Sequence, residues 1–258
     1  GKLSQLVGVL PKELSGSWGI GHTRWATHGM VTDLNAHPFY GNRNKVAAVH
    51  NGIIENFQQL RADLQKEGVE FSSETDSEVI PNLVEKHYSG NLLDAVQKAL
   101  NEVIGTYALA ITCVDEPDKI VVAKRGGPLV IGLSDNAYYI ASDVNAIVGN
   151  TTRVIYLEDG DIVEVTKDGL KFPNVINNDY AKRVEEITIN AHEMEKCGYE
   201  TYMEKEINEQ PESIERAFAG RIDMENATAK MSGFEDDIFK RTKKICCMTT
   251  GTIWYASY

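Results

Sequence analysis

Between residues 55 and 165 the hydrophobic pattern changes from helical to strand-like spacing, and this change limits the fold to a mixed class. Apolar residues at helical spacing predict three helices: 55–67, from about Thr75 onward, and 91–103. Short β-rich runs separated by turn residues then predict four strands: 107–114, 120–123, 129–133 and 138–141. Helices beside a run of antiparallel strands are typical of an α+β layered domain.

Two Gly-containing pairs predict turns within this outline. The apolar run 46–49 ends at His50-Asn51-Gly52, which predicts a buried strand followed by a turn. Asp159-Gly160 separates two strand-like halves of 154–165, which predicts a hairpin.

Helix ends are also predicted from single residues. Thr75 and Glu78 have capping-box spacing, which places Asp76 in the first turn of its helix. Pro81 lies too deep for a first-turn proline, so we expect a kink or a later start. A further helix, with a break at an internal proline, is expected at 204–220.

Charge and cysteine content narrow the class of function. Lys and Arg total 26 and Asp and Glu total 38, a net charge of -12, so we expect no nucleic-acid partner. No apolar run approaches the roughly 18 residues of a membrane helix, and the first ten residues lack a signal-peptide pattern. We therefore expect no membrane partner. The 4 cysteines lack zinc-knuckle spacing, which favours a reduced, cytoplasmic protein.

The densest group of reactive side chains lies between Gly21 and Gly29. Histidines gather around it without the i, i+3 or i, i+4 spacing of ligand helices, so hydrogen-bonded histidines in a polar loop layer are favoured over a metal site for His22 and His37. Arg24 beside the following tryptophan has two open interpretations. The pair is either an arginine fork for a carboxylate under an aromatic cover, or a core tryptophan beside a solvated arginine.

Two further residue groups have both a simple and a functional interpretation. Asn51 and Gly52 form an ordinary turn in the simple case, but an amide and a backbone N–H can also point at one oxygen, as an oxyanion hole requires. Asp76 either caps a helix or pairs with an ammonium group. Together with Arg24, these residues suit a pocket for an α-amino acid and acyl transfer from glutamine or asparagine.

Ordered motifs carry a family resemblance. HTRWATHG, NAHP, HNGIIEN and SETDSEVI, in this order, closely resemble the glutaminase domain of the glutamine–fructose-6-phosphate aminotransferases, also called glucosamine-6-phosphate synthases. The resemblance continues through RGGPLVIG, YYIASD, YLEDGDIVEV and MEKEINEQPESI, to about Ile222. The first and third motifs mark class II glutamine amidotransferases in general, whereas MEKEINEQPESI indicates the aminotransferase.

The resemblance implies a role for each candidate residue. Arg24 would bind the glutamine carboxylate, Asp76 would bind the α-amino group, and Asn51 with Gly52 would form the oxyanion hole. A loop that closes over the substrate would contribute three more residues: Trp25, Thr27 and His28. The implied fold is the four-layer α/β/β/α sandwich of N-terminal-nucleophile hydrolases, with antiparallel sheets and no metal or organic cofactor. The implied reaction makes glucosamine 6-phosphate from fructose 6-phosphate and glutamine, the first step of amino-sugar biosynthesis.

The resemblance also implies a nucleophile that this chain does not show. Family members use an N-terminal cysteine, which the resemblance places several dozen residues before Gly1. Cys113 lies in an apolar strand and is expected to be buried and inert. The remaining cysteines lie in the polar, irregular segment 168–200 and near the C-terminus: Cys197, Cys246 and Cys247. We therefore expect a fragment, truncated at both ends, that does not hydrolyse glutamine alone.

The expected organisation has three parts. Residues 1–200 would form the glutaminase domain, 201–240 the linker helices, and 241–258 the first strand and loop of an α/β sugar-isomerase domain. In that loop Thr250 and Ile253 replace the family's usual Cys and Ser. We expect the full-length enzyme to be a homo-oligomer that uses glutamine and, through its sugar-isomerase domains, fructose 6-phosphate. Two alternatives stay open: another class II amidotransferase, and a non-catalytic glutamine-binding or interaction module.

Overall fold

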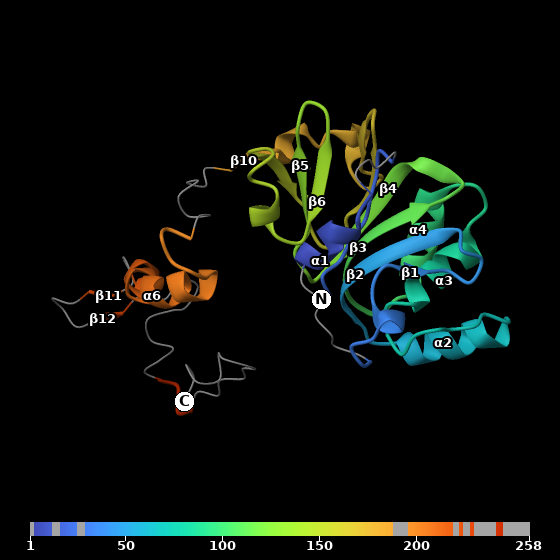
Figure 1. Ribbon diagram of the computed structural model, residues 1–258, viewed down its shortest axis with the longest axis horizontal. Coiled ribbons are helices and arrows are strands. Elements are labelled where there is room, and N and C mark those ends of the chain that lie inside the picture. The colour runs from blue at the N-terminus through green and yellow to red at the C-terminus, as the bar shows by residue number, and fades with distance from the viewer. Residues whose placement is uncertain are drawn as a thin grey trace. The chain divides into compact units, whose positions relative to one another are not determined.

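The computed structural model describes residues 3–11, 16–24, 29–187, 196–218, 222–223, 228–229 and 241–244. The chain divides into two compact units, Gly1–Ile189 and Asn190–Tyr258, and each is described by itself. The larger unit contains two antiparallel sheets together with helices (Figure 1). It begins with the short helix α1, Leu3–Val9, and carries the 3-10 turn η1, Asp33–Asn35.

The first sheet has six strands in the order β1-β2-β3-β4-β8-β9, and every neighbouring pair is antiparallel. Its most extensive pairing joins β2 and β3, from Val46 opposite Cys113 to Ile54 opposite Gly105. The strand bounds are β1 Phe39–Tyr40, β2 Val46–Ile54, β3 Gly105–Cys113, β4 Glu116–Arg125, β8 Ile162–Thr166 and β9 Gly169–Lys171.

The second sheet has four shorter strands in the order β10-β7-β5-β6, also antiparallel throughout. Its bounds are β5 Val130–Leu133, β6 Tyr138–Ala141, β7 Arg153–Tyr156 and β10 Glu185–Glu186. The four β-rich runs predicted after residue 105 are therefore confirmed as β3 to β6.

Three helices cover one face of the first sheet: α2 Phe57–Lys66, α3 Val79–His87 and α4 Leu92–Asn101. Successive strand residues point to opposite faces, so Val46, Ala48 and Ile54 of β2 pack among these helices. At the start of α4 the side chain of Asn91 accepts a hydrogen bond from the Asp94 N–H, as an N-cap residue does. The helices predicted at 55–67 and 91–103 are confirmed.

A second core lies between the two sheets. Val49, Ala110 and Val122 face it from the first sheet, and Ile131 and Ile155 face it from the second. A smaller cluster on the other side of the second sheet joins Val130 and Val154 to Ile147, which follows the 3-10 turn η2, Val144–Ala146. Helices and two antiparallel sheets thus form the α+β sandwich that was predicted.

The turn predicted at Asn51-Gly52 and the hairpin predicted around Asp159-Gly160 are both wrong, although Asp159-Gly160 does form a turn. Strand β2 continues through Asn51 and Gly52 to Ile54 because the pairing with β3 is unbroken there. Asp159-Gly160 does not close a hairpin, since β7 and β8 lie in different sheets. The Asp159 carboxylate instead accepts hydrogen bonds from Lys124 Nζ and the Gly126 N–H, at 2.6 and 2.9 Å, and so anchors this crossing to the end of β4.

The predicted capping box is also wrong. Helix α3 begins at Val79, without a side-chain cap, so the expected later start is confirmed and Pro81 falls in the first turn, where proline is tolerated. Glu78 accepts hydrogen bonds from Ser72 and Ser73 and holds the preceding loop instead. Asp76 consequently lies before the helix and not in its first turn.

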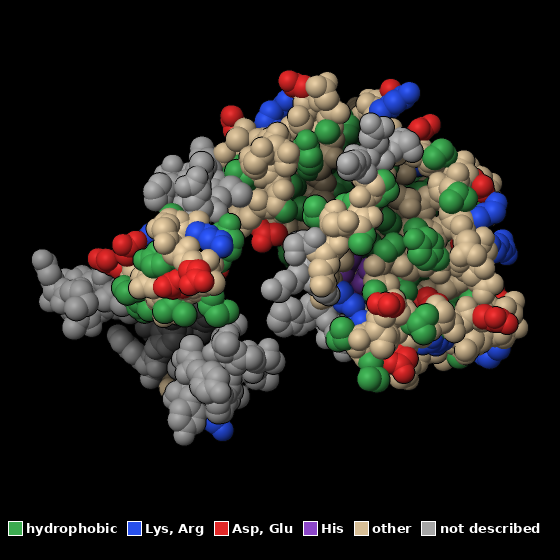
Figure 2. Space-filling model, in the orientation of Figure 1, with side chains coloured by type: hydrophobic (Ala, Val, Ile, Leu, Met, Phe, Trp, Pro, Cys, Tyr) green, Lys and Arg blue, Asp and Glu red, His purple; other side chains and the backbone are tan. Residues whose placement is uncertain are grey.

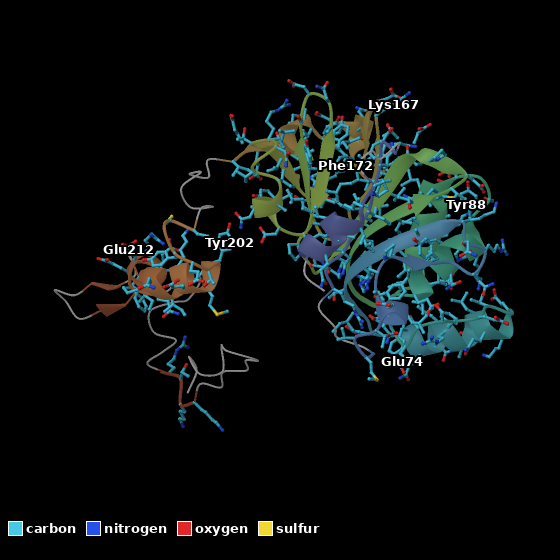
Figure 3. The ribbon with its side chains drawn as sticks, in the orientation of Figure 1. Glu74, Tyr88, Lys167, Phe172, Tyr202 and Glu212 are labelled. Carbon is cyan, nitrogen blue, oxygen red and sulfur yellow. The ribbon has the colours of Figure 1, made fainter. Side chains whose placement is uncertain are left out.

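In the second unit, helix α6, Tyr202–Phe218, continues through Pro211, so the predicted break is wrong. Figure 3 labels Tyr202 and Glu212 on this helix. Proline has no backbone N–H and so removes one hydrogen-bond donor, but the helix continues on both sides of it. Hydrophobic side chains are exposed on α6 (Figure 2): Tyr202, Met203, Ile207, Ile214 and Phe218. Strands β11, Ile222–Asp223, and β12, Thr228–Ala229, form a small antiparallel pair.

The predicted sugar-isomerase loop at 250–253 lies outside the described residues. Within the described part of the chain, no helix combines the length and apolar character needed to cross a membrane.

Candidate active site

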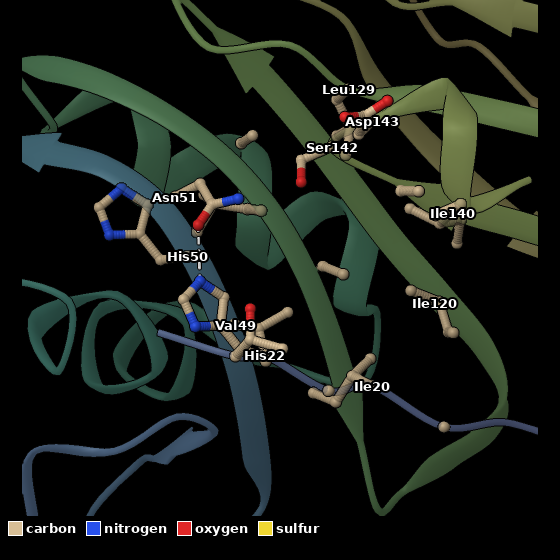
Figure 4. A pocket seen from close by; sticks show the side chains of 18 of the residues that line it. Ile20, His22, Val49, His50, Asn51, Ile120, Leu129, Ile140, Ser142 and Asp143 are labelled. Carbon is tan, nitrogen blue, oxygen red and sulfur yellow. Dashed lines mark hydrogen bonds between the residues drawn. The ribbon is translucent and has the colours of Figure 1, made fainter. Parts of the chain in front are cut away.

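A pocket of about 780 Å³ opens between the two sheets of the larger unit (Figure 4). Apolar residues in its walls include Ile20, Val49, Ile120 and Ile140. Polar residues line it as well: Ser17, His22, Thr23, His50, Asn51, Ser142 and Asp143. A pocket that combines apolar walls with a few polar groups is the usual form of a small-molecule site.

Asn51 reaches this pocket from the centre of β2. It pairs with Ala108 of β3 and lies on the inter-sheet face, two residues after Val49 of the inter-sheet core. The next residue, Gly52, has φ 140°, and a Cβ there would lie 2.2 Å from the Thr106 carbonyl oxygen. The strand can therefore pass this point only as glycine. The predicted pair Asn51 and Gly52 is in place, on a strand rather than a turn.

His22 joins Asn51 to the segment that carries Arg24. Its Nε2 lies 2.6 Å from Asn51 Oδ1, and its Nδ1 accepts the Arg24 backbone N–H at 2.7 Å. Arg24 itself has φ 51°, a left-handed conformation that costs a non-glycine residue energy and is common at functional sites. The imidazole therefore brings two predicted site residues together across 27 positions of sequence.

Polar side chains also bind the backbone of Met30, six residues after Arg24. The guanidinium of Arg24 donates to the Met30 carbonyl at 3.0 Å, and Asn35 Nδ2 donates to the same carbonyl at 3.0 Å. Glu74, labelled in Figure 3, accepts from the Met30 N–H and from Asn35 Nδ2, both at 3.3 Å. Arg24 and Met30 are thus bonded to each other, and Glu74 and Asn35 bond to Met30 as well.

Asp76 lies against β2 beyond the glycine. It is buried, and its Oδ2 accepts the Ile54 N–H at 2.7 Å. A buried carboxylate oxygen needs such a donor to offset the loss of its hydration. Asp76 is not among the residues that line the pocket. Its proposed contact with an ammonium group therefore stays a prediction.

His50 points away from the pocket interior, toward the helices (Figure 4). Its Nδ1 lies 2.8 Å from the Ser77 hydroxyl, and its Nε2 lies 3.3 Å from the Thr106 carbonyl. Burial lowers the pKa of His50, while the Asp76 charge opposes that shift. His50 is therefore a neutral connection between β2, β3 and the segment before α3.

His37 packs behind His22 and differs from what was predicted. The two rings lie 4.1 Å apart between centroids, and Phe39 meets His37 edge-on at 4.7 Å. Neither ring nitrogen of His37 has a hydrogen-bond partner among the described residues, because aromatic rings surround it instead. Burial, followed by the charges of His22, His50 and Arg24, lowers its pKa to about 3. The prediction of a hydrogen-bonded histidine holds for His22 and is wrong for His37.

The remaining candidates are not brought to the pocket by the described structure. The predicted loop residues Trp25, Thr27 and His28 lie outside the described residues. Cys113 is buried on the helix side of β3, opposite Val46. It lies five residues along the strand from the partner of Asn51, roughly 17 Å at about 3.4 Å per residue. No cluster of three or more His, Cys, Asp or Glu able to hold a metal occurs among the described residues.

The bond between His22 and Asn51 is the feature that sequence patterns missed. Only the second bond of His22 had a local signal, because a histidine two residues before the arginine can accept the N–H of residue i+2. Asn51 lines the pocket, while Arg24 and Asp76 lie near it in the structure, Arg24 through its bond to His22 and Asp76 through its bond to the end of β2. This arrangement can bind a small zwitterion and donate hydrogen bonds to a carbonyl oxygen.

Comparison with known proteins identifies a related family. Residues 22–149 match the family model of the glutamine amidotransferase domain. Curated relatives are glutamine–fructose-6-phosphate aminotransferases: one from Clostridium perfringens is 43% identical over 99% of this chain, and one from Clostridium acetobutylicum is 48% identical over 86%. The chain spans 42% and 37% of those relatives, about two fifths of their length.

One similar solved structure is the glutamine phosphoribosylpyrophosphate amidotransferase of B. subtilis, which is 28% identical to this chain. The match covers 66% of this chain and 34% of that chain, with a TM-score of 0.49. The family match contains Arg24, Asn51, Gly52 and Asp76, the residues that were predicted for the site. Residues 22–149 therefore form a glutamine amidotransferase domain, within a chain that is similar over most of its length to glutamine–fructose-6-phosphate aminotransferases.

Proposed function

We propose that this chain binds glutamine and releases its amide nitrogen as ammonia for the synthesis of glucosamine 6-phosphate from fructose 6-phosphate. The observation that carries the proposal is the hydrogen-bonded group Arg24, His22 and Asn51 beside Gly52, at the pocket between the sheets. The relatives support both substrates, since they are named as glutamine–fructose-6-phosphate aminotransferases. We further propose that the protein is a cytoplasmic homo-oligomer.

Each site residue then has one task. The Arg24 guanidinium binds the α-carboxylate, and the buried Asp76 carboxylate binds the α-ammonium group. The Asn51 amide and the Gly52 N–H donate to the side-chain oxygen as it gains negative charge. One such donor is typically worth about 3–4 kcal/mol in the transition state. Trp25, Thr27 and His28 belong to the loop that would cover the substrate.

The nucleophile is the remaining element. We propose a cysteine supplied by a segment outside these 258 residues, with its own α-amine as the base. The thiolate adds to the amide carbon, the amine protonates the departing nitrogen, and water then releases glutamate from the thioester. Cys113 cannot take this role, because it is buried on the opposite face of the sheet. The chain alone is therefore expected to be inactive.

Substrate analogues test the assignment of Arg24 and Asp76. The native protein that carries this sequence is assayed for ammonia release from glutamine, from 4-aminobutanamide, which lacks the carboxylate, and from 4-carbamoylbutanoate, which lacks the amine. Arg24→Met should reduce kcat/KM for glutamine by roughly 10- to 100-fold, the usual value of a charged hydrogen bond, and leave 4-aminobutanamide unchanged. Asp76→Asn should do the same for glutamine while sparing 4-carbamoylbutanoate.

A non-catalytic glutamine-binding module is the second candidate, favoured by the same binding residues. The two are separated by measuring glutamine binding and ammonia release on the same native protein. Binding without ammonia release would support the module and contradict the enzyme. Sustained ammonia release by the isolated 258-residue chain would contradict the proposed external nucleophile.

A further inference from the structure

We propose that His22 is a positioning residue that fixes which end of the Asn51 amide faces the pocket. The inference rests on the proposed function, because the value of a fixed amide is the hydrogen bond that it donates to the reacting oxygen. In this scheme His22 acts through its two hydrogen-bonded neighbours, Asn51 and Arg24.

The protonation of the His22 ring follows from its partners. A backbone N–H can only donate, and the Arg24 N–H points at Nδ1 from 2.7 Å. Nδ1 must therefore carry the lone pair, and the single ring proton of the neutral imidazole lies on Nε2. At 2.6 Å from Asn51 Oδ1, Nε2 is then the donor and the amide oxygen is the acceptor.

The direction of the Asn51 amide follows in turn. An asparagine side chain can place its oxygen or its nitrogen in either of two positions, which differ by a half-turn. Turning it would set Asn51 Nδ2–H against the Nε2–H of His22, two donors facing each other. With the oxygen held by His22, the nitrogen points away from the imidazole and toward the open side of the pocket (Figure 4). The amide is thereby kept as a donor toward the ligand.

The environment of His22 keeps the ring in place without competing for its nitrogens. His37 stacks against it at 4.1 Å, and Phe39 supports His37 from the edge. The low pKa of His37, about 3, keeps that neighbour neutral around pH 7, and neither of its nitrogens bonds to a described residue. These tilted and edge-on ring contacts support the ring plane, and the bonds to Arg24 and Asn51 set its rotation.

The two bonds of His22 separate into two measurable effects. The bond to Asn51 concerns the transition state, so its loss should lower kcat. The bond to Arg24 concerns the residue proposed to bind the carboxylate, so its loss should raise KM. A histidine that served only to stabilise the loop would not divide its effects in this way.

Two amide substitutions mimic one nitrogen each. Asparagine reaches as far as Nδ1, so His22→Asn keeps an acceptor for the Arg24 N–H and removes the donor to Asn51. Glutamine reaches as far as Nε2, so His22→Gln keeps the donor to Asn51 and removes the acceptor for Arg24. In the native enzyme we expect His22→Asn to lower kcat roughly 10- to 100-fold with KM little changed, part of the loss of a whole oxyanion-hole donor. We expect His22→Gln to raise KM several-fold with kcat nearly unchanged.

A double-mutant cycle shows whether His22 acts through Asn51. In an Asn51→Ala background, adding His22→Asn should lower kcat by less than about twofold, because the amide that it orients is gone. His87→Gln is the matched control, since His87 pairs with Glu102 at the end of α3 and does not line the pocket. The inference would be overturned if both His22 variants changed kcat and KM to the same extent. It would also be overturned if the effects of His22→Asn and Asn51→Ala on kcat were fully additive.

A spectroscopic measurement tests the hydrogen bonds without relying on activity. Nitrogen chemical shifts of the ¹⁵N-labelled imidazole should show His22 protonated on Nε2 and unprotonated on Nδ1 at neutral pH. The opposite tautomer, or a doubly protonated ring, would overturn the inference. Absence of glutamine hydrolysis in the wild-type enzyme would refute the proposed function, and with it the catalytic meaning of His22. Normal wild-type activity with unaltered His22 variants would refute this inference alone.

Discussion

The two faces of β2 differ in how completely they are covered. On the helix side, Ile54 and the facing Val79 and Ile80 are 0% exposed. On the other side, Val49 and Ala110 are each 9% exposed, and a pocket of about 780 Å³ separates part of the two sheets. One face is closed by helices and the other is hollow. The difference indicates that the helix side supplies stability while the inter-sheet side has room for a ligand.

Adjacent residues of β2 show the same division. His50 points to the closed face, where Ser77 and Thr106 hold its two nitrogens. Asn51 points to the open face, where His22 holds its oxygen. Because strand residues alternate, a functional amide is placed beside a residue that anchors the strand. Positioning of this kind is more precise on a strand than on a loop.

The largest effect is expected at Gly52, where the two faces depend on one another. Gly52→Ala would place a Cβ 2.2 Å from the Thr106 carbonyl oxygen and 2.9 Å from His50 Nε2. Backbone cannot move aside within a central strand pair, so we expect a loss of more than about 4 kcal/mol in the free energy of unfolding, or no folded protein. Urea unfolding with circular dichroism measures it.

Gly68→Ala provides the matched control for Gly52→Ala. Gly68 also has a positive φ, 91°, but a Cβ there meets nothing within 4 Å. Backbone strain without a clash should cost about 1 kcal/mol. Comparable losses in the two variants would show that the close approach of β2 to β3 is not what requires glycine at position 52.

A pair of substitutions separates the faces directly. Leu109 of β3 is fully buried on the helix side, and Leu109→Ala should destabilise the protein by about 2–5 kcal/mol while kcat of the folded fraction is retained. Asn51→Ala should cost less than about 1 kcal/mol in stability, yet lower kcat by roughly 100- to 1000-fold. Unfolding curves and glutaminase kinetics on both variants are compared. If each variant lost stability and kcat in similar proportion, the division between the faces would be wrong.

The elements of the fold were largely predictable, and their connections were not. Helices α2 and α4 and strands β3 to β6 follow from periodicity because each buries one regular stripe. The Asn51-Gly52 pair has the composition of a turn, but the pairing with β3 overrides this local preference. Asp159-Gly160 is a turn in the connection between the two sheets. It is held by a hydrogen bond to Lys124, on a strand 35 residues away. Such an anchor leaves no local pattern.

The candidate site was predictable in its residue types and not in its hydrogen bonds. Arg24, Asn51 and Asp76 could be named because their chemistry suits an amino acid ligand. The expected position of Asp76 in a helix failed because Glu78 binds the preceding loop and α3 starts later. The role of His22 required a distance of 2.6 Å between residues 29 positions apart. Contacts of that range are set by the sheet, which no local pattern contains.

The smallest predicted effect concerns His37, whose ring contacts the pocket residue His22 and has no hydrogen-bonded nitrogen among the described residues. Its pKa is about 3 in the folded protein, below the value of about 6.5 for an unfolded histidine. The unfolded chain therefore binds more protons below about pH 6.5, so the free energy of unfolding falls as the pH is lowered from about 6.5 toward 3. His37→Phe keeps an aromatic ring beside His22 and Phe39 and removes the titrating group. The variant should match the wild type near pH 8 and lose less stability by pH 5, measured by urea unfolding at each pH. Parallel pH curves for the two proteins would show that His37 is not neutral and desolvated in the folded protein. Water would then reach the ring beside His22 more readily than its packing implies.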